Sequence, residues 1–500
     1  MTALSKNQLT AYRQCHRKLW LELRQPELKS DTAKAQSAFK SGRDVGDVAR
    51  LIYDPEMQGI VIEIRDGGVD AAIRRTSDAL HKRRPIFGGG FQAEEAIAFA
   101  DILLPVEDAD GFAWRLVAIK SATSVKEHYG DDIAIQAFAA REAGIHLTSV
   151  SVGLIDNSFV YPGDGDYRGV LFESDLSNDA SERQSEITLW IKEAQNVLAL
   201  SDEPNISTGA HCNAPYACGF HEHCSAMEHK AKYPASLLPR IQSKALKQFL
   251  GTRPVVELAD IPDELLNARQ LRVKHQTLSD RCFFDSVSAA AELAAHSLPA
   301  YFLDFETIQF SIPIWKGTRP FQQIPFQFSL HKLSDAGILE HHDFLDLSGN
   351  DPSQEFAATL VSQCGDSGPV FVYNAGFEAT RIRELADRFP ELSAPLLAII
   401  DRIVDLLRIA ERHYYHPAQR GSWSIKAVLP TIAPELRYDM LDGVQNGGMA
   451  MDAFMEAQAS ATTADRKNII DRQLRNYCKL DTYALVRIWQ EFSGNSRLQL

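Results

Sequence analysis

The hydrophobic and polar positions divide the chain into two outer regions of alternating strands and helices, with a helical region between them. In the first outer region, apolar runs bounded by turn residues predict four strands, over 59–64, 98–104, 114–122 and 149–155. A helical pattern between the third and fourth strands predicts a helix over 131–144. In the second, the same criteria predict three strands and a final helix, over 301–308, 325–333, 370–377 and 476–492. We therefore predict an α/β fold class and three parts, over 1–225, 226–298 and 299–500.

The N-terminal segment predicts a single helix. Ser5 and Gln8 have the spacing of a capping box at its start, and Pro26 ends it. Between them, apolar residues recur at helical spacing, namely Leu9, Tyr12, Leu19, Trp20 and Leu23. Cys15 has the spacing of the same face, so we expect it to point inward.

The composition is that of an ordinary globular protein, with 45% hydrophobic and 24% charged residues among 500. This balance excludes a disordered, collagen-like or coiled-coil chain. No run of 18 apolar residues occurs, and the first residues lack the apolar core of a signal peptide. The seven cysteines form no dense framework. We therefore expect a cytoplasmic protein without disulfides and without membrane association.

The charge is unevenly distributed. A formal net charge of −14 argues against a protein that coats nucleic acid through charge alone. Residues 1–50 contain ten Lys or Arg and five Asp or Glu, so they carry +5 and the remainder carries −19. This distribution is compatible with nucleic-acid binding by the basic segment, with metal-binding carboxylates in the acidic body, or with acidity that serves only solubility.

Two carboxylates lie on the first predicted strand of the C-terminal region. Asp304 and Glu306 are two residues apart, so both project from one face of the strand. Their neighbours are apolar, which predicts a central, buried strand. Buried like charges are costly unless a cation neutralises them, and Mg²⁺ or Mn²⁺ prefers such oxygen ligands. The alternative is an edge strand with two solvated acids.

Two further motifs follow in order. Asn374, Phe377 and Glu378 lie at a predicted junction between a strand and a helix. Tyr477 and Asp481 are four residues apart, on one face of the final helix. Each motif alone is weak evidence for a functional site, but the three motifs in this order are a fairly specific combination.

The three motifs resemble those of the DnaQ-like 3′–5′ exonucleases, which have an RNase H-like fold. The resemblance implies that two metal ions, about 4 Å apart, are held by Asp304, Glu306, Glu378 and Asp481. It also implies that Tyr477 orients or helps to deprotonate the attacking water, and that Asn374 contacts substrate. The family usually has Asp where this chain has Glu378, whose extra methylene requires a more distant backbone.

Residues near these motifs have open interpretations. Tyr477 is alternatively a packing tyrosine, and Asp405 matches a position that supports the fold. The segments 321–331 and 413–430 are rich in aromatic and polar residues. Their aromatics, including Tyr415 and Trp423, either stack on the bases of a single strand or belong to the core.

Three regularly spaced cysteines indicate a metal site. Cys212, Cys218 and Cys224 are separated by five residues each, in a polar segment that also contains histidines. With Cys15 as a fourth thiolate, the set resembles that of the RecB/AddB-type and CRISPR-associated iron–sulfur nucleases. The resemblance implies a 4Fe–4S cluster held by one early and three late cysteines. Zinc bound with help from histidine, or unliganded cysteines, are the alternatives.

The region between these cysteines resembles the PD-(D/E)xK nuclease core of the same family, with one acid missing. Asp101 fits the family's aspartate, Lys120 its lysine and Gln136 the glutamine of the following helix. Position 118, where the metal-binding glutamate is expected, is Ala118. Alanine cannot coordinate a metal, so this resemblance implies a DNA-binding domain with impaired cleavage. Ala118 is either a natural degeneration or an engineered change.

Two alternatives to this interpretation remain open. Other acids can in principle replace the missing glutamate, namely Glu94, Glu95, Asp131 or Asp132. Alternatively, Asp101 and Lys120 are an ordinary solvated or paired couple.

Together these motifs predict a metal-dependent nuclease. The resemblances imply that its C-terminal part is a two-metal 3′–5′ exonuclease on single-stranded DNA or DNA with free ends, and that its N-terminal part is an iron–sulfur PD-(D/E)xK domain. DNA repair or defence against foreign DNA is the setting that family analogy implies. RNA is the alternative substrate. A non-catalytic nucleic-acid-binding or assembly module is the alternative from another functional class.

Overall fold

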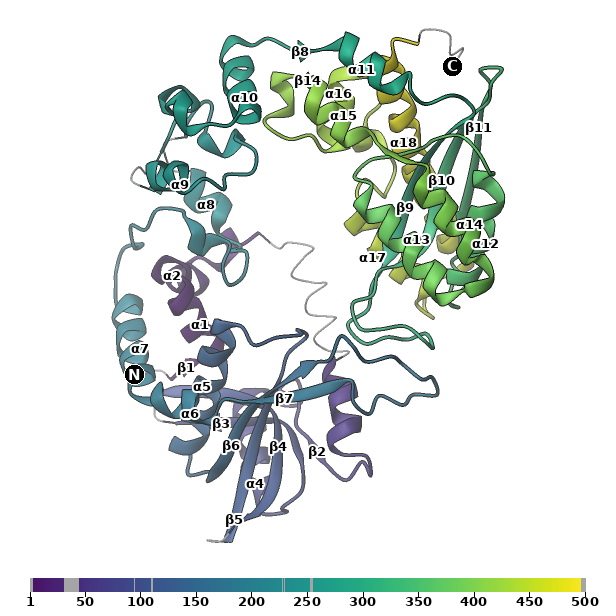
Figure 1. The fold of residues 1–500 in the computed structure, drawn as a ribbon. Helices are drawn as coiled ribbons and strands as arrows, with labels where there is room; N and C mark the ends of the chain where they lie inside the picture. Colours follow the sequence, from purple (N-terminus) through teal and green to yellow (C-terminus); the bar gives the residue numbers. More distant parts are fainter. Residues whose placement is uncertain are drawn as a thin grey trace. The chain divides into compact units, whose positions relative to one another are not determined.

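The computed structural model describes residues 3–30, 45–93, 95–108, 111–226, 228, 230–251 and 255–495. The chain forms two compact units. The first contains Met1–Glu228 and Phe310–Gln322, and the second contains His229–Gln309 and Gln323–Leu500. Each unit mixes helices with a mixed sheet (Figure 1), so the predicted α/β class is confirmed. Among the described residues, no helix combines the length and apolarity needed to cross a membrane.

The first unit is built around one sheet and the helices that cover it (Figure 1). Its strands are β1 (Leu4–Ser5), β2 (Ile60–Val61), β3 (Ile86–Gln92), β4 (Ala96–Asp108), β5 (Gly111–Ile119), β6 (Leu147–Ile155) and β7 (Leu171–Asp175). Its helices are α1 (Lys6–Gln14), α2 (His16–Arg24), α4 (Gly68–Leu80), α5 (Glu127–Glu142), α6 (Ser177–Glu182), α7 (Gln184–Leu198) and α8 (His221–Ala226). The strand predicted over 59–64 is reduced to β2.

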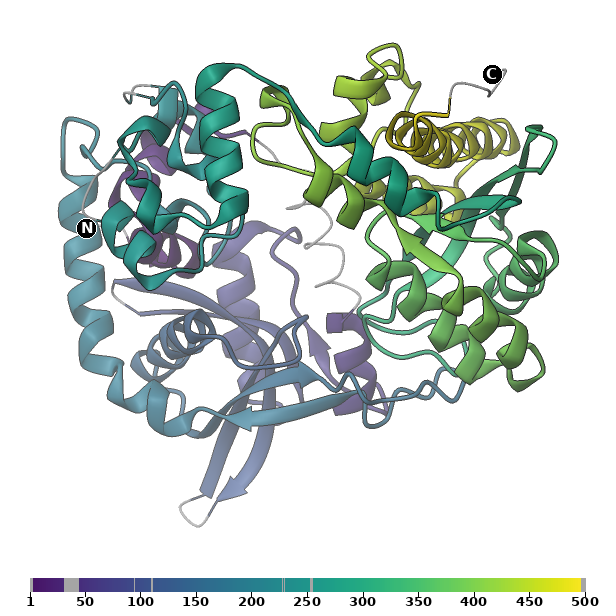
Figure 2. The same ribbon diagram turned by 45° about the horizontal axis from the view of Figure 1, so that its top comes forward.

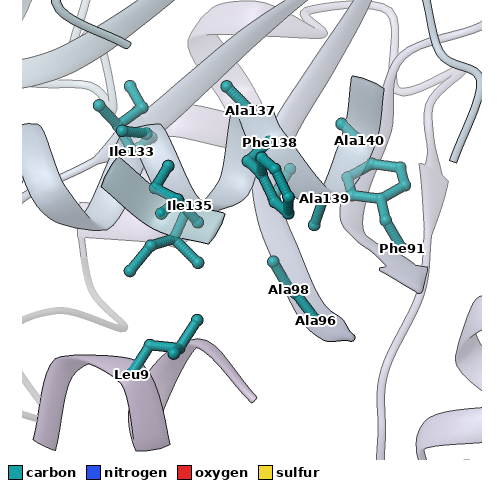
Figure 3. Close-up of a cluster of buried hydrophobic side chains, with 14 of the residues drawn as sticks. Leu9, Phe91, Ala96, Ala98, Ile133, Ile135, Ala137, Phe138, Ala139 and Ala140 are labelled. Carbon is teal, nitrogen blue, oxygen red and sulfur yellow. The ribbon is translucent and has the colours of Figure 1, made fainter. Parts of the chain in front are cut away.

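The described strands of this sheet follow the order β2-β3-β4-β5-β6-β7, with β1 paired to β4. The β4–β5 pair is antiparallel and the β5–β6 pair is parallel. Helix α5 packs on the sheet through a cluster of buried apolar side chains (Figure 3). Alanines contribute on both sides, including Ala96 and Ala98 on β4 and Ala137 on α5, so the helix approaches the sheet closely.

The N-terminal segment forms two helices rather than the single helix predicted. The capping box at Ser5 and Gln8 is confirmed. However, Cys15 has an extended backbone, with φ −166° and ψ 127°, and separates α1 from α2. Helical spacing alone does not reveal this break, because the residues on both sides remain in phase. Leu23 is 43% exposed rather than buried.

The second unit contains a five-stranded sheet, a separate two-stranded sheet and the remaining described helices (Figure 1). Its strands are β8 (Phe283–Phe284), β9 (Ala300–Ile308), β10 (Ile324–Leu333), β11 (Leu339–Leu345), β12 (Val370–Val372), β13 (Ile403–Asp405) and β14 (Tyr414–Tyr415). Its helices are α9 (Lys244–Gly251), α10 (Ala268–Ser279), α11 (Ser286–Leu293), α12 (Ser353–Cys364), α13 (Gly376–Arg388), α14 (Pro390–Asp401), α15 (Leu406–His413), α16 (Ile425–Ile432), α17 (Gly447–Gln458) and α18 (Ala464–Ser493).

Strand β9 is central in the order β11-β10-β9-β12-β13. It pairs antiparallel with β10 and parallel with β12. Its side chains alternate between two cores. Leu303 and Phe305 face α12, α13 and α14, whereas Phe302 faces α18, the long yellow helix in Figure 2. Even-numbered positions of β9 therefore point toward α18.

The segment predicted as a connector, 226–298, is joined to the second unit from His229 onward. Strand β8 pairs with β14, and Leu237 and Val273 belong to the same buried cluster as α18. Tyr415 and Trp423 are 0% and 5% exposed and lie in this cluster. Their interpretation as core residues is therefore correct, and neither is available to stack on a base.

Substitution of Gly368 tests the close approach between the backbone just before β12 and Pro299, which directly precedes β9. Its φ is +88°, and an added Cβ would lie 1.9 Å from the backbone oxygen of Pro299. Gly337 has a similar φ of +79° but open space around it, which makes it a matched control. We expect Gly337→Ala to cost about 1–2 kcal/mol from the backbone conformation alone. Gly368→Ala should cost an additional ~1–3 kcal/mol from overpacking.

Urea denaturation followed by tryptophan fluorescence measures both variants. An equal decrease in the free energy of unfolding in the two variants would contradict the close contact between Gly368 and Pro299.

Candidate metal centre

Three carboxylates converge where β9 faces α18. Asp304 and Glu306 occupy even-numbered positions of β9, and Asp481 lies on α18. One carboxylate oxygen from each lies within 4.8 Å of the others. Glu306 and Asp481 are buried, whereas Asp304 is partly exposed. The predicted alternation of the strand and the helical spacing of the final motif thus bring these residues together.

Glu378 lies in the first turn of α13 and is 1% exposed. It lies outside the group of three oxygens, but its charge raises the pKa of Asp304. Its Oε2 and the Oδ2 of Asp481 are buried and have no hydrogen-bond partner. Buried carboxylate oxygens without partners are costly, so both are available as ligands for a cation.

The carboxylates have strongly raised pKa values. Burial and the charges of Asp481, Glu378 and Glu306 raise the pKa of Asp304 well above its usual range. Burial, with a contribution from Asp481, raises the pKa of Glu306 to about 8. Burial also raises the pKa of Glu378 to about 8 and that of Asp481 to about 6. Without a cation, the cluster therefore retains protons near neutral pH.

Two residues that the sequence analysis did not single out complete the surroundings of Asp481. The Tyr438 hydroxyl donates a 2.6 Å hydrogen bond to its Oδ1. The Lys426 ammonium lies 4.8 Å from the centre of the Tyr438 ring and 5.1 Å from that of Tyr477. The hydrogen bond and the charge of Lys426 both limit the rise in the pKa of Asp481.

The sequence offered an indirect signal for one of these two residues. Lys426 lies within the aromatic and polar segment 413–430, which flanks the motifs. Tyr438 follows no motif spacing, and only the tertiary structure brings it to α18.

The turn between β12 and α13 is held by Asp405. Asn374 has a left-handed φ of +79°, and its backbone N–H donates to Asp405 Oδ1 at 3.0 Å. The same oxygen accepts from the Leu407 N–H and caps α15. Asp405 therefore has the fold-supporting role predicted for it. The Asn374 side chain is exposed beside the helix that carries Glu378.

Comparison with known proteins links this region to sequences without an assigned activity. Residues 301–424 match a family described as a domain of unknown function, DUF2779. The chain is also similar to the uncharacterized protein MG366 of Mycoplasma genitalium, at 28% identity over 207 residues. That match covers 37% of this chain and 31% of MG366, so the chain spans less than a third of that relative's length. The family match includes Glu378 and ends before α18.

The four predicted cluster cysteines line one pocket in the first unit. Cys15, Cys212, Cys218 and Cys224 border it, and none of the seven cysteines forms a disulfide. Burial raises the pKa of Cys224 to about 11, and the charge of Arg17 partly opposes this shift. The thiol of Cys224 therefore stays protonated near neutral pH until a metal displaces the proton.

Hydrogen bonds bring Cys15 to the late cysteines. The Gln14 amide donates to the backbone oxygens of His211 and Tyr216 at 2.8 and 2.7 Å. Trp20 Nε1 donates to the Leu200 oxygen at 3.2 Å, and the Arg17 guanidinium donates to the Ile206 oxygen at 3.0 Å.

In the first unit, the residues of the predicted nuclease core do not form a carboxylate cluster. Asp101 is exposed, and its Oδ2 accepts a 2.8 Å hydrogen bond from the backbone N–H of Ile119. Lys120 pairs with Asp132 rather than with Asp101. Gln136 is fully buried, donates to Asp132 at 3.3 Å, and leaves its Oε1 without a partner.

Two of the other acids near this core, Asp131 and Asp132, are engaged in ion pairs. Ala118 is fully buried. Asp131 pairs with Arg13 and Arg183, and Asp132 pairs with Lys6 as well as Lys120. Glu94 lies outside the described residues. Within the described part of the chain, the only three-ligand group compact enough to hold one ion is the one at Asp304.

The raised pKa values predict how stability depends on pH. The folded, metal-free protein binds more protons than the unfolded chain, because the pKa values of these acids are higher in the folded state. Its free energy of unfolding should therefore fall as the pH rises from about 5 to about 8. Mn²⁺ binds the deprotonated carboxylates, so it should raise the unfolding temperature more at about pH 8 than at about pH 6.

Differential scanning calorimetry with and without Mn²⁺ tests this dependence. Asp304→Asn should weaken both the pH slope and the shift caused by Mn²⁺. Asp471→Asn, on an exposed ion pair of the same helix, should preserve both. An unchanged Mn²⁺ shift in Asp304→Asn would exclude the carboxylate cluster as the binding site.

Proposed function

We propose that the second unit is a metal-dependent 3′–5′ exonuclease that acts on single-stranded DNA. The observation that carries the proposal is the convergence of three carboxylates within 4.8 Å, in surroundings that disfavour their charge. Such a group is costly without cations and well suited to bind them. The central position of β9 in a mixed sheet supports the proposed RNase H-like fold.

The residues present fit Mg²⁺ or Mn²⁺, because all the donors are carboxylate oxygens and two of these are buried without partners. Asp304, Glu306 and Asp481 would hold the metal, with Glu378 as a further ligand. Glu378, in the first turn of α13, lies close enough to Asp304 for its charge to raise the pKa of that acid, which supports it as the further ligand. When bound, the metal ions supply Lewis-acid activation of a phosphodiester.

The protein's own residues provide orientation and proton control. Burial and the nearby carboxylates raise the pKa of Tyr477 far above its usual range. Its hydroxyl therefore stays protonated, and it orients a water by hydrogen bonding rather than accepting a proton from it. Lys426 donates to the Tyr477 hydroxyl at 3.4 Å and to the Gln445 oxygen at 2.8 Å, which fixes this edge of the site.

For the first unit we propose a PD-(D/E)xK-type domain that carries a 4Fe–4S cluster and binds DNA with impaired cleavage. The donor set fits the cluster, because four cysteines line one pocket. A single zinc ion with Zn–S bonds of about 2.3 Å needs thiolates roughly 3.8 Å apart. No three of these sulfurs lie within 4.8 Å of one another. A 4Fe–4S cluster instead takes one thiolate at each of four separate iron atoms, and four cysteines line this pocket.

Impaired cleavage follows from Ala118 and from the ion pairs around it. Asp101 alone cannot hold a catalytic cation, since the nearby Asp131 and Asp132 are engaged by basic side chains. A cytoplasmic setting, and a role in DNA repair or defence, stay predictions from the family resemblance. RNA remains the alternative substrate, because carboxylate chemistry does not distinguish the two sugars.

A strand-shortening assay tests the proposed catalysis. With Mn²⁺ and a 5′-labelled single strand, the wild-type protein should give a ladder of stepwise shortened products. Asp304→Asn should reduce the rate by at least about 100-fold, because even groups behind a metal ligand contribute 10–100-fold. Asp471→Asn, which is isosteric and lies on the surface of α18, should retain the wild-type rate.

Binding without shortening in all three proteins would favour the non-catalytic module. An equal loss of the shortening rate in Asp304→Asn and Asp471→Asn would indicate a folding defect.

Metal analysis tests the cysteine pocket. Anaerobically purified protein should contain about four iron atoms per chain and absorb broadly near 400 nm. Cys218→Ser should lose both signals, because it removes one corner ligand. Cys282→Ser, at an exposed cysteine outside the pocket, should keep them. Stoichiometric zinc without iron would replace the cluster by a zinc site.

A further inference from the structure

An arginine-rich surface lies on the second unit where α10 and the segment before it meet α15. Glu411 is 7% exposed and accepts from Arg269 through both oxygens, at 2.8 and 3.0 Å. Arg408 and Arg240 approach the same carboxylate at 3.2 and 3.5 Å. The guanidinium of Arg272 donates to the backbone oxygen of Glu411 at 3.0 Å. Three guanidinium groups thus surround one carboxylate, and a fourth contacts the backbone of the same residue.

The four arginines outnumber the two acids that pair with them, Glu411 and Asp405. Arg240 and Arg408 are 60% and 51% exposed. Burial and the neighbouring charge of Arg269 lower the pKa of Arg272, as expected where cations are crowded. Such a positive surface on a chain with a net charge of −14 is a local attraction for a polyanion.

A groove runs beside these arginines and adds polar groups that suit phosphate and sugar oxygens. It is lined by two arginines, Arg240 and Arg269, by the polar residues Gln242, Ser243 and Asn267, and by one acid, Glu264, among others. Arginine with amide and hydroxyl side chains is the combination that contacts nucleic-acid backbones without reading the bases.

The surface is connected to the carboxylate site through intervening residues of the same unit. Arg408 lies 3.8 Å from Asp405, which holds the turn at Asn374. Arg269 lies over the Trp423 ring at 5.7 Å, and the Trp423 backbone oxygen accepts from the Tyr373 hydroxyl at 2.6 Å. Tyr373 directly precedes Asn374, so the arginines adjoin the edge of the site from which Glu378 projects.

We propose that Arg240, Arg269, Arg272, Arg408 and the adjoining groove bind the phosphodiester backbone of a single strand whose 3′ end occupies the carboxylate site. This inference rests on the proposed exonuclease function and adds to it the place where the rest of the strand is held. The surface contributes affinity for long strands, whereas the carboxylates act on the terminal phosphodiester alone.

Comparing a small and a long substrate tests the proposal. The p-nitrophenyl ester of thymidine 5′-phosphate reports the carboxylate site, and a long oligothymidylate reports that site plus the arginine surface. In the double variant Arg240→Gln/Arg408→Gln, KM for the oligothymidylate should rise. Its dependence on salt should weaken by about 0.7 log units per log unit of salt for each arginine removed. The kcat for both substrates should stay close to wild type.

The double variant Arg168→Gln/Arg466→Gln is the matched control. It removes the same charge from two exposed ion pairs elsewhere, with Asp166 and Glu456. A KM and salt dependence equal to wild type in Arg240→Gln/Arg408→Gln would overturn the proposal. Equal loss of activity on the small ester would also overturn it, because the arginines would then act on the carboxylate site itself.

Fluorescence anisotropy with labelled oligothymidylate and oligouridylate separates binding from catalysis. Arginine-dependent binding by a wild-type protein that hydrolyses neither substrate would uphold the surface and reject the exonuclease. Hydrolysis that is unchanged when the arginines are replaced would support the exonuclease and reject the arginine surface. Absence of both binding and hydrolysis would reject both proposals.

Discussion

The burial of carboxylates that repel one another is the constraint on which the second unit depends. Burial and mutual repulsion raise the pKa values of Asp304 and Glu306. Such an arrangement persists only where the backbone holds the groups firmly or a cation neutralises them. The central strand β9 and the 30-residue helix α18 provide that rigidity, because Phe302 and Trp489 pack together beside the acids.

A polar layer between α18 and β10 fixes how the helix presents its acid. Thr482, the residue after Asp481, contacts Ser329 at 2.7 Å and His331 at 2.8 Å. Gln327 donates to a backbone oxygen of α18 at 2.9 Å. Burial lowers the pKa of His331 to about 3, so the ring is neutral and adds no charge behind the carboxylates. These contacts set the rotation of α18, which apolar packing alone leaves less defined.

The sequence predicted the parts of the site that depend on local periodicity. Strand alternation placed Asp304 and Glu306 on one face, and helical spacing placed Tyr477 and Asp481 together. The contributions of Tyr438 and Lys426 arise from tertiary contacts between distant segments, which no spacing encodes. The break at Cys15 was missed for a related reason, because the phase of a helix survives a single extended residue.

The hydrogen bonds that join the N-terminal helices to residues 200–216 have a consequence for biosynthesis. Gln14 and Trp20 find their partners at Tyr216 and Leu200. As the chain leaves the ribosome, these hydrogen bonds therefore form only after the whole sheet of the unit has been synthesised. Throughout this interval the thiol of Cys15 lacks its three later companions, so completion of the cysteine pocket is among the last events in the maturation of the first unit.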